Sequence, residues 1–116
     1  MTDVTIYHNP RCSKSRETLA LLENTDANIS IIKYLETPPS IDTLQKIIAL
    51  LGFDSARQLM RTKEAIYKEL ALKEEQNEAA LLAAMVENPK LIERPIVLAN
   101  GKAAIGRPPE SVLSII

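Results

Sequence analysis

The first third of the chain changes from a strand-like to a helix-like hydrophobic pattern and back again. The apolar run at residues 4–7 predicts a strand, which His8-Asn9-Pro10 ends. Within residues 13–22 the apolar positions recur at helical spacing, and the β-branched run at residues 28–34 predicts a second strand. A strand, a helix and a strand in this order favour a parallel strand pair.

The middle of the chain has a helical pattern throughout. Ser40 is placed to cap a helix that ends at Gly52. The apolar face of this helix consists of Ile41, Leu44, Ile47, Ile48 and Leu51. Residues 54–87 form shorter helical pieces, whose predicted N-caps are Ser55, Thr62 and Asn77. The polar run at residues 73–77 predicts a solvated connection, and Asn88-Pro89 ends the last piece.

The last third returns to strands. Residues 95–99 and 102–105 flank Asn100-Gly101, a strong signal for a β-hairpin. Pro108-Pro109 opens a final helix, whose predicted apolar side consists of Val112, Leu113 and Ile116. The whole order predicts an α/β fold, with βαβ and ββα halves around a mixed four-stranded sheet. We expect a single domain over residues 1–116, with a helical insert at about residues 40–90.

Composition excludes several classes of function. The 116 residues carry a formal net charge of −1, which does not favour a nucleic-acid-binding surface. The apolar runs are too short to span a bilayer, so no membrane partner is expected. The N-terminal residues lack the pattern of a secretory signal, and we therefore expect the protein in the reducing cytoplasm.

The only cysteine, Cys12, lies between the end of the first predicted strand and the start of the predicted helix. Unpaired backbone N–H groups and the positive end of the helix dipole favour a thiolate at this position, and they also favour a bound oxyanion. Arg11, Lys14 and Arg16 add positive charge nearby. These polar neighbours favour an accessible, reactive thiol over the alternative, which is a small buried hydrophobic residue.

A metal site is not expected. One cysteine permits neither a disulfide within the chain nor a cysteine-based zinc site. His8 is the only histidine and therefore offers no cluster for another metal.

Five motifs occur in order along nearly the whole chain: IYHNPRCSKSRETL, YLETPPS, LMR ending at Arg61, ERPIV around Arg94, and GRPPE around Arg107. Together they resemble the glutaredoxin-coupled arsenate reductase family, a group with a thioredoxin-like fold. The resemblance implies that the sulfur of Cys12 attacks arsenate. It also implies that the oxyanion is bound by Arg61, Arg94 and Arg107.

The implied roles fit the chemistry of these side chains. Planar guanidinium groups suit a tetrahedral dianion such as arsenate, although each arginine has the alternative of a surface ion pair with Asp or Glu. His8 and Ser15 match positions that help to keep the cysteine ionised, and the Ser15 hydroxyl stands near enough to donate to the sulfur. For His8 the alternative is a strand-end histidine that is bonded only to the backbone. Pro95 matches the cis-proline that faces the cysteine in thioredoxin-like folds.

The sequence from Cys12 to Ser15 is CxxS, so the second thiol has to come from another molecule. The resemblance implies that glutathione is a co-substrate, that glutaredoxin is a partner, and that no cofactor is bound. We expect a monomer. Two alternatives stay open: a monothiol oxidoreductase that acts on another oxyanion or on glutathionylated protein, and a binding module like the related transcription regulators. Such regulators commonly carry a CxxC switch, which Ser15 removes here.

Overall fold

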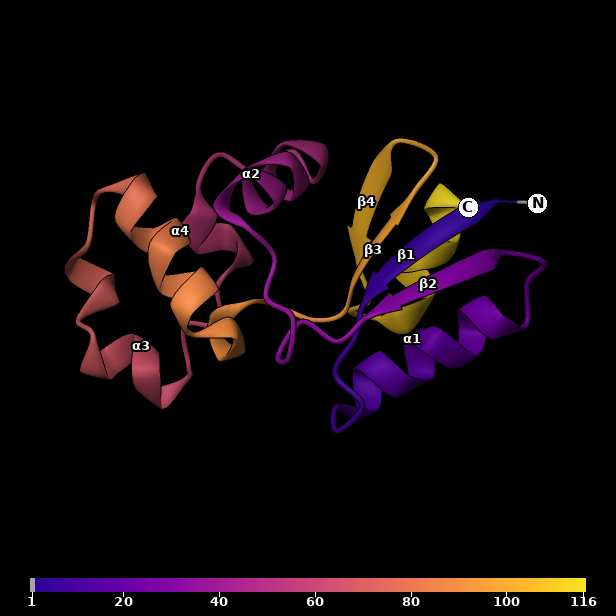
Figure 1. Ribbon diagram of the computed structural model, residues 1–116, viewed down its shortest axis with the longest axis horizontal. Helices are drawn as coiled ribbons and strands as arrows, with labels where there is room; N and C mark the ends of the chain where they lie inside the picture. Colours follow the sequence, from indigo (N-terminus) through magenta and orange to yellow (C-terminus); the bar gives the residue numbers. More distant parts are fainter. Residues whose placement is uncertain (1) are drawn as a thin grey trace. The chain divides into compact units, whose positions relative to one another are not determined.

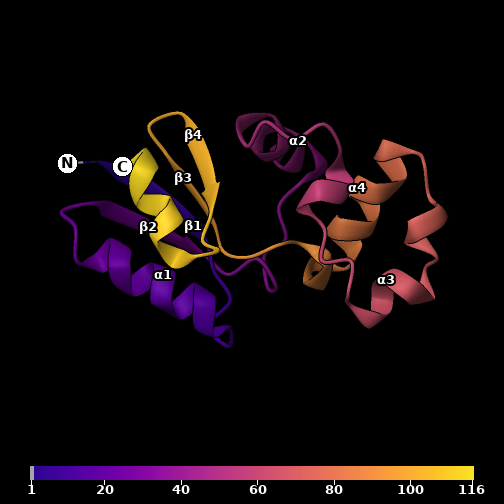
Figure 2. The ribbon, with the colours of Figure 1, turned by 180° about the vertical axis from the view of Figure 1, so that it is seen from behind.

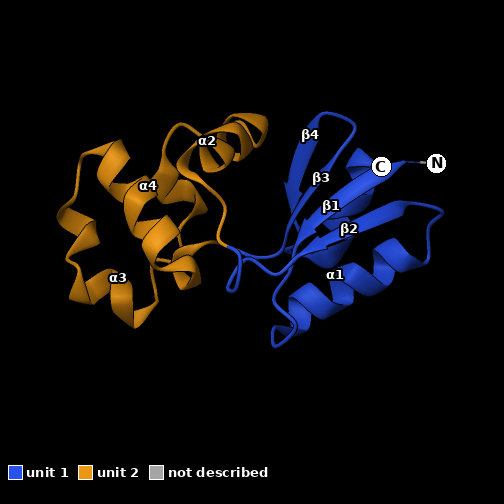
Figure 3. Ribbon diagram, in the orientation of Figure 1, with its two compact units in different colours: residues 1–37, 94–116 blue, residues 38–93 orange. Residues whose placement is uncertain are grey.

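The computed structural model describes residues 2–116 and divides into two compact units. The first unit combines the chain up to Thr37 with Arg94–Ile116, and the second unit is Pro38–Glu93 (Figure 3). The predicted helical insert therefore corresponds to the second unit. None of the helices formed by residues 2–116 combines the length and the hydropathy needed to cross a bilayer.

The first unit contains a four-stranded sheet in the order β2-β1-β3-β4 (Figure 1). Its strands are β1 (Asp3–Tyr7), β2 (Asn28–Ile32), β3 (Ile96–Ala99) and β4 (Lys102–Ile105). β1 and β2 are parallel, whereas the β1–β3 and β3–β4 pairs are antiparallel. The predicted mixed α/β sheet is confirmed. β2 ends two residues earlier than predicted, because the carbonyl of Lys33 accepts the N–H groups of Glu36 and Thr37 in a turn.

Helix α1 (Ser13–Glu23) and the C-terminal 3-10 helix η4 (Pro109–Ile115) pack together and enclose the core of the first unit. Figure 2 shows η4, in yellow, in front of the sheet. The core between these helices and the sheet consists of Val4, Ile6, Leu22, Val97, Ala99, Val112 and Ile115.

The prediction for the last helix is wrong in its type and, at Leu113, in its buried face, whereas Val112 is buried and Ile116 packs against the core as predicted. The segment is a 3-10 helix, in which residues three apart share a face. Val112 and Ile115 therefore point into the core, while Leu113 is 42% exposed.

The hairpin between β3 and β4 forms as predicted. Asn100 and Gly101 have φ angles of 53° and 71°, the left-handed conformation that an Asn-Gly hairpin turn requires. The Asn100 side chain also donates to the carbonyl of Ile115, with an N–O distance of 2.9 Å. The turn is thus bonded to the last helix of the same unit.

The second unit is helical. Its α-helices are α2 (Ile41–Leu50), α3 (Ala65–Glu69) and α4 (Glu78–Glu87), and its 3-10 helices are η1 (Ala56–Leu59), η2 (Leu72–Glu74) and η3 (Pro89–Leu91). The predicted N-caps Ser40, Ser55 and Asn77 are confirmed, since each side chain accepts a backbone N–H of its helix.

One prediction for the second unit is wrong. The cap of α3 is Glu64 rather than Thr62, because the chain first turns through a bond from the Glu64 N–H to the Arg61 carbonyl. The polar run at residues 73–77 is exposed except at the half-buried Glu75, as predicted for a solvated connection, and its first two residues belong to η2. The Arg57 guanidinium donates to the carbonyls of Leu72 and Glu75 and thereby fixes this segment.

A carboxylate joins two helices of the second unit. Glu78 accepts hydrogen bonds from the Ala56 N–H and the Ser55 hydroxyl, at 2.7 and 2.6 Å. The bond from Ala56, then that from Ser55, lowers the pKa of Glu78 below its ordinary value. A lowered folded-state pKa stabilises the fold above the unfolded-state pKa, and this contribution is lost as the pH falls.

We expect Glu78→Gln to lower the stability near pH 7 and to leave it nearly unchanged at the acid end, where the wild-type carboxylate is itself protonated. Urea unfolding at a series of pH values, down to below the ordinary Glu pKa, measures the difference. Glu74→Gln, at an exposed carboxylate on η2, is the control. A stability difference between wild type and Glu78→Gln that does not change with pH would contradict the role of this carboxylate.

Candidate active site

Cys12 is the N-cap of α1. Its N–H donates to the Asn9 carbonyl, and its own carbonyl accepts the Arg16 N–H, each at 3.0 Å. The first turn of α1 contains no acidic residue, so no carboxylate there opposes a negative charge at the N-terminus of the helix.

The cysteine is less accessible than its neighbours predict. Cys12 is 8% exposed, whereas Arg11, Ser13 and Lys14 are exposed. The flanking polar side chains extend into solvent, and the N-cap conformation turns the thiol inward beneath them. The expectation of an accessible thiol is therefore wrong.

Behind the cysteine, His8 and Ser15 form a buried pair. The His8 Nδ1 lies 2.6 Å from the Ser15 Oγ, and the Asn9 N–H also donates to this oxygen at 3.0 Å. Burial, followed by the positive charges of Lys33 and Arg16, lowers the pKa of His8, so that the imidazole is neutral near pH 7. In the tautomer with a proton on Nδ1, His8 donates to the Ser15 oxygen. The Ser15 hydroxyl proton can then donate to an acceptor other than His8.

The predicted proline lies at the same end of the sheet. The Arg94–Pro95 peptide bond is cis, and Tyr7 pairs with Ile96, so Pro95 lies across from the residues that follow β1. The Gly106 N–H donates to the Pro95 carbonyl at 2.9 Å. A second cis bond, Arg107–Pro108, was not predicted, because nothing in the sequence marks it apart from the proline itself.

Gly106, which follows β4, packs against Pro95 and against helix α1. A Cβ atom at this position would lie 2.7 Å from the Pro95 ring and closer still to the Thr18 hydroxyl of α1. Thr18 is fully buried and bonded to the Lys14 carbonyl at 2.8 Å, so it cannot move away easily. Thr18 and Gly106 were not predicted as packing residues of the site, because their contact depends on how the chain folds.

We expect Gly106→Ala to lower the free energy of unfolding by about 1–3 kcal/mol, because the added methyl group overpacks a closed site. Urea denaturation measures this loss. Thr18→Ala removes one of the clashing side chains, so the double variant should lose less stability than the two single variants combined. Additive losses would contradict the proposed contact.

Arg94 and Arg107 are joined to each other. The Arg107 Nε donates to the Arg94 carbonyl at 2.9 Å. The Nε of Arg94 is buried and has no hydrogen-bond partner within residues 2–116. A buried donor without a partner costs about 1–3 kcal/mol, so a ligand that accepts this hydrogen bond would be stabilised there.

Arg61 belongs to the second unit. Its Nη1 lies 2.7 Å from the Glu64 Oε1, and the two side chains are 27% and 30% exposed. Its backbone N–H donates to the Leu91 carbonyl at 2.7 Å. The structure thus brings Cys12, His8 and Ser15 to the end of the sheet where Arg94, Pro95 and Arg107 lie, and describes Arg61 in an ion pair of its own unit.

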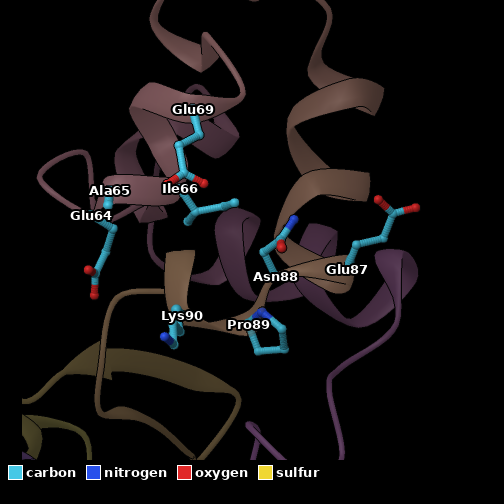
Figure 4. A pocket seen from close by; sticks show the side chains of 8 residues that line it. All are labelled: Glu64, Ala65, Ile66, Glu69, Glu87, Asn88, Pro89 and Lys90. Carbon is cyan, nitrogen blue, oxygen red and sulfur yellow. The ribbon is translucent and has the colours of Figure 1, made fainter.

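A cavity of about 400 Å³ lies beside this ion pair in the second unit. Figure 4 shows side chains of α3 facing the segment that follows α4 across it. Its charged lining residues are Glu64, Glu69, Glu87 and Lys90. Three carboxylates and one ammonium group disfavour an oxyanion. Among residues 2–116, no group of three His, Cys, Asp or Glu side chains could hold a metal ion.

Comparison with known proteins identifies the family. Residues 7–115 match the model of the ArsC family. The chain belongs to the ArsC family. The predicted resemblance is therefore confirmed at the level of the family.

Three similar proteins match this ArsC-family chain over nearly their whole length. It is 60% identical over 114 residues to an uncharacterised protein, YfgD, of Escherichia coli K12, covering 97% of this chain and 96% of the relative. It is 50% identical over 117 residues to an arsenate reductase of Neisseria meningitidis serogroup B, covering 100% of both. The structure of an arsenate reductase from Vibrio cholerae superposes with a TM-score of 0.95 at 58% identity, covering 99% of this chain and 98% of that one. The predicted thioredoxin-like fold is confirmed.

Proposed function

We propose that this protein reduces arsenate to arsenite, with Cys12 as the nucleophile and with glutathione and glutaredoxin as external reductants. The observation that carries the proposal is the combination of Cys12 at the N-terminus of α1 with the buried, unpartnered Nε of Arg94 at the same end of the sheet. An oxyanion would satisfy this donor and lie near the nucleophile. The names of the relatives from Neisseria and Vibrio support arsenate as this oxyanion.

The arginines supply the charge that arsenate needs. Arsenate is a dianion near neutral pH, and a guanidinium group can donate two parallel hydrogen bonds to two of its oxygens. The bond from Arg107 to the Arg94 backbone keeps these two residues together. Arg61 is the third proposed ligand, and its ion pair with Glu64 engages Nη1 and leaves the other donors of the guanidinium to bind the oxyanion.

The reaction proceeds through an arsenic–sulfur bond. The Cys12 thiolate attacks As(V), and one arsenate oxygen leaves as water after protonation. The thiolate of glutathione then attacks the Cys12 sulfur, the sulfur–arsenic bond breaks, and its electron pair stays on arsenic, which leaves as As(III) in arsenite. A glutaredoxin thiol takes the glutathione from the Cys12 mixed disulfide and restores the thiolate. In total, two thiols become one disulfide and one water is formed.

His8 and Ser15 are proposed to support the thiolate. Their 2.6 Å hydrogen bond is buried, and the neutral imidazole has a tautomer that donates to the Ser15 oxygen. In this tautomer the Ser15 hydroxyl proton is available to the sulfur of Cys12, the N-cap of the helix that carries Ser15.

A second function is favoured by Ser15 itself. It stands where a dithiol enzyme has its second cysteine, and its hydroxyl is fully buried and bonded to His8. Such a site can exchange one thiol with a glutathionylated protein without binding any oxyanion. The alternative is therefore a monothiol oxidoreductase.

A paired assay separates the two functions. Purified protein is given arsenate, glutathione and glutaredoxin, and arsenite is measured; in parallel it is given a glutathionylated peptide, and release of glutathione is measured. We expect sustained arsenite formation that depends on both reductants. Peptide deglutathionylation without any arsenite would favour the monothiol oxidoreductase.

We also infer a monomer that acts in the cytoplasm. An unpaired nucleophilic cysteine stays reduced in the cytoplasm, where glutathione is available.

A further inference from the structure

A second cavity, of about 300 Å³, lies in the first unit next to the turn that carries Cys12. One wall is His8–Arg11, which follows β1, and the other is formed by Lys33, Leu35 and Glu36, which follow β2. The two walls are neighbours because β1 and β2 are parallel and the His8 N–H donates to the Ile32 carbonyl at 2.8 Å. We call this space the loop cavity.

Hydrogen bonds hold both walls in place. On the first wall, the Asn9 side chain accepts the Arg11 N–H, and the Pro10 carbonyl accepts the Arg16 guanidinium, each at 3.0 Å. On the second wall, the Lys33 carbonyl accepts two N–H groups at 2.9 Å. The loop cavity is therefore lined by ordered turns, and its size lies at the lower end of the range for small-molecule sites.

The charged groups of the loop cavity are two cations, Arg11 and Lys33, and one carboxylate, Glu36. Within residues 2–116 none of these three side chains takes part in an ion pair or a side-chain hydrogen bond. Leu35, which is 40% exposed, adds an apolar surface. The lowered pKa of His8, caused by burial and then by Lys33 and Arg16, agrees with a positive potential in this region.

We propose that the loop cavity binds the reducing thiol, a small peptide with two carboxylates and one ammonium group, namely free glutathione. The two cations match the two carboxylates, and Glu36 matches the ammonium group. The position suits the reaction, because Arg11 directly precedes Cys12, and the Cys12 N–H is bonded to the Asn9 carbonyl in the same turn. The inference rests on the proposed function, since it places the co-substrate of that reaction.

The test measures binding without arsenate, so that it does not depend on the proposed reaction. The probe is S-methylglutathione, which keeps all three charges but cannot react, titrated by NMR into the Cys12→Ser protein. We expect chemical-shift changes at the backbone of residues 8–11 and 33–36. Lys33→Gln should raise the dissociation constant about threefold, and Arg11→Gln with Lys33→Gln about tenfold, as expected for exposed ion pairs.

Lys102→Gln, at an exposed lysine on β4, is the matched control and should leave binding unchanged. Unchanged binding in the double variant, or an equal loss in Lys102→Gln, would overturn the inference. Shifts confined to residues 94–107 would also overturn it, by placing the peptide at the proline side of the site. Failure of arsenate reduction with intact probe binding would instead count against the proposed function alone. A parallel titration with glutaredoxin that shifts residues 8–11 and 33–36, while the probe does not, would also overturn the inference, because the surface would then bind the protein partner.

Discussion

Cys12→Ser should abolish arsenite formation, with a loss of at least about a thousandfold in turnover. Cys12 is the one proposed nucleophile, and a serine hydroxyl at neutral pH neither attacks arsenic at a useful rate nor forms the disulfide that the reaction needs. The substitution is nearly isosteric, and Cys12 makes its hydrogen bonds through its backbone, so the fold should be preserved. Arsenite formation by the wild type and the variant, at equal concentrations, measures the effect.

The control for this loss is thermal unfolding of the same two proteins. An unchanged unfolding midpoint, together with loss of alkylation by iodoacetamide, would attribute the defect to the missing thiol. Residual arsenite formation at more than a few per cent of the wild-type rate would contradict the role of Cys12, because it is the only cysteine of the chain.

Arg94→Lys should weaken arsenate binding by about tenfold to a hundredfold, although the net charge does not change. The lysine ammonium cannot reproduce the donation from the buried Nε or the paired donation of the guanidinium group. Charged hydrogen bonds of this kind contribute about 1.5–3 kcal/mol each, which corresponds to the expected change. The KM for arsenate measures it. The inhibition constant of phosphate, which has the same shape and charge but is not reduced, measures oxyanion binding independently of the redox step.

Arg61→Lys is the comparison for Arg94→Lys. Arg61 already forms an ion pair with Glu64, so we expect Arg61→Lys to change the KM for arsenate and the inhibition constant of phosphate less than Arg94→Lys does. If Arg94→Lys kept the wild-type KM for arsenate and the wild-type inhibition constant of phosphate, the site would require only positive charge and not the guanidinium geometry. A larger effect in Arg61→Lys than in Arg94→Lys would contradict the ranking and would make the second unit the principal anion ligand.

Local signals predicted much of the fold because each one specifies a backbone geometry. Asn100-Gly101 supplies the two left-handed residues of a hairpin turn, and the side chains of Ser40 and Asn77 bond the N–H groups that begin their helices. The last helix could not be predicted in the same way. An α-helix and a 3-10 helix share the same sequence signals, and the packing of Val112 and Ile115 against the sheet decides between them.

The site was predictable in its residue types but not in its contacts. The strand-to-helix position of Cys12 is visible in the sequence, whereas its burial depends on how the turn folds back. The bond between His8 and Ser15 joins residues seven apart, and the bond between Arg107 and the Arg94 carbonyl joins residues thirteen apart. The latter contact follows from β3–β4 pairing, which brings Gly106 beside Pro95. The loop cavity likewise depends on the register of β1 and β2.

A single-turnover experiment with arsenate and glutathione, in the absence of glutaredoxin, tests whether the Cys12 thiol reduces the oxyanion. We predict a rapid burst of about one arsenite per protein chain, accompanied by glutathione linked to Cys12, and then a slow phase that glutaredoxin accelerates. Mass spectrometry locates the mixed disulfide and quantifies it against the arsenite released. Arsenite without a mixed disulfide on Cys12, or a glutathione-linked Cys12 without arsenite, would contradict the proposal that this thiol reduces the oxyanion.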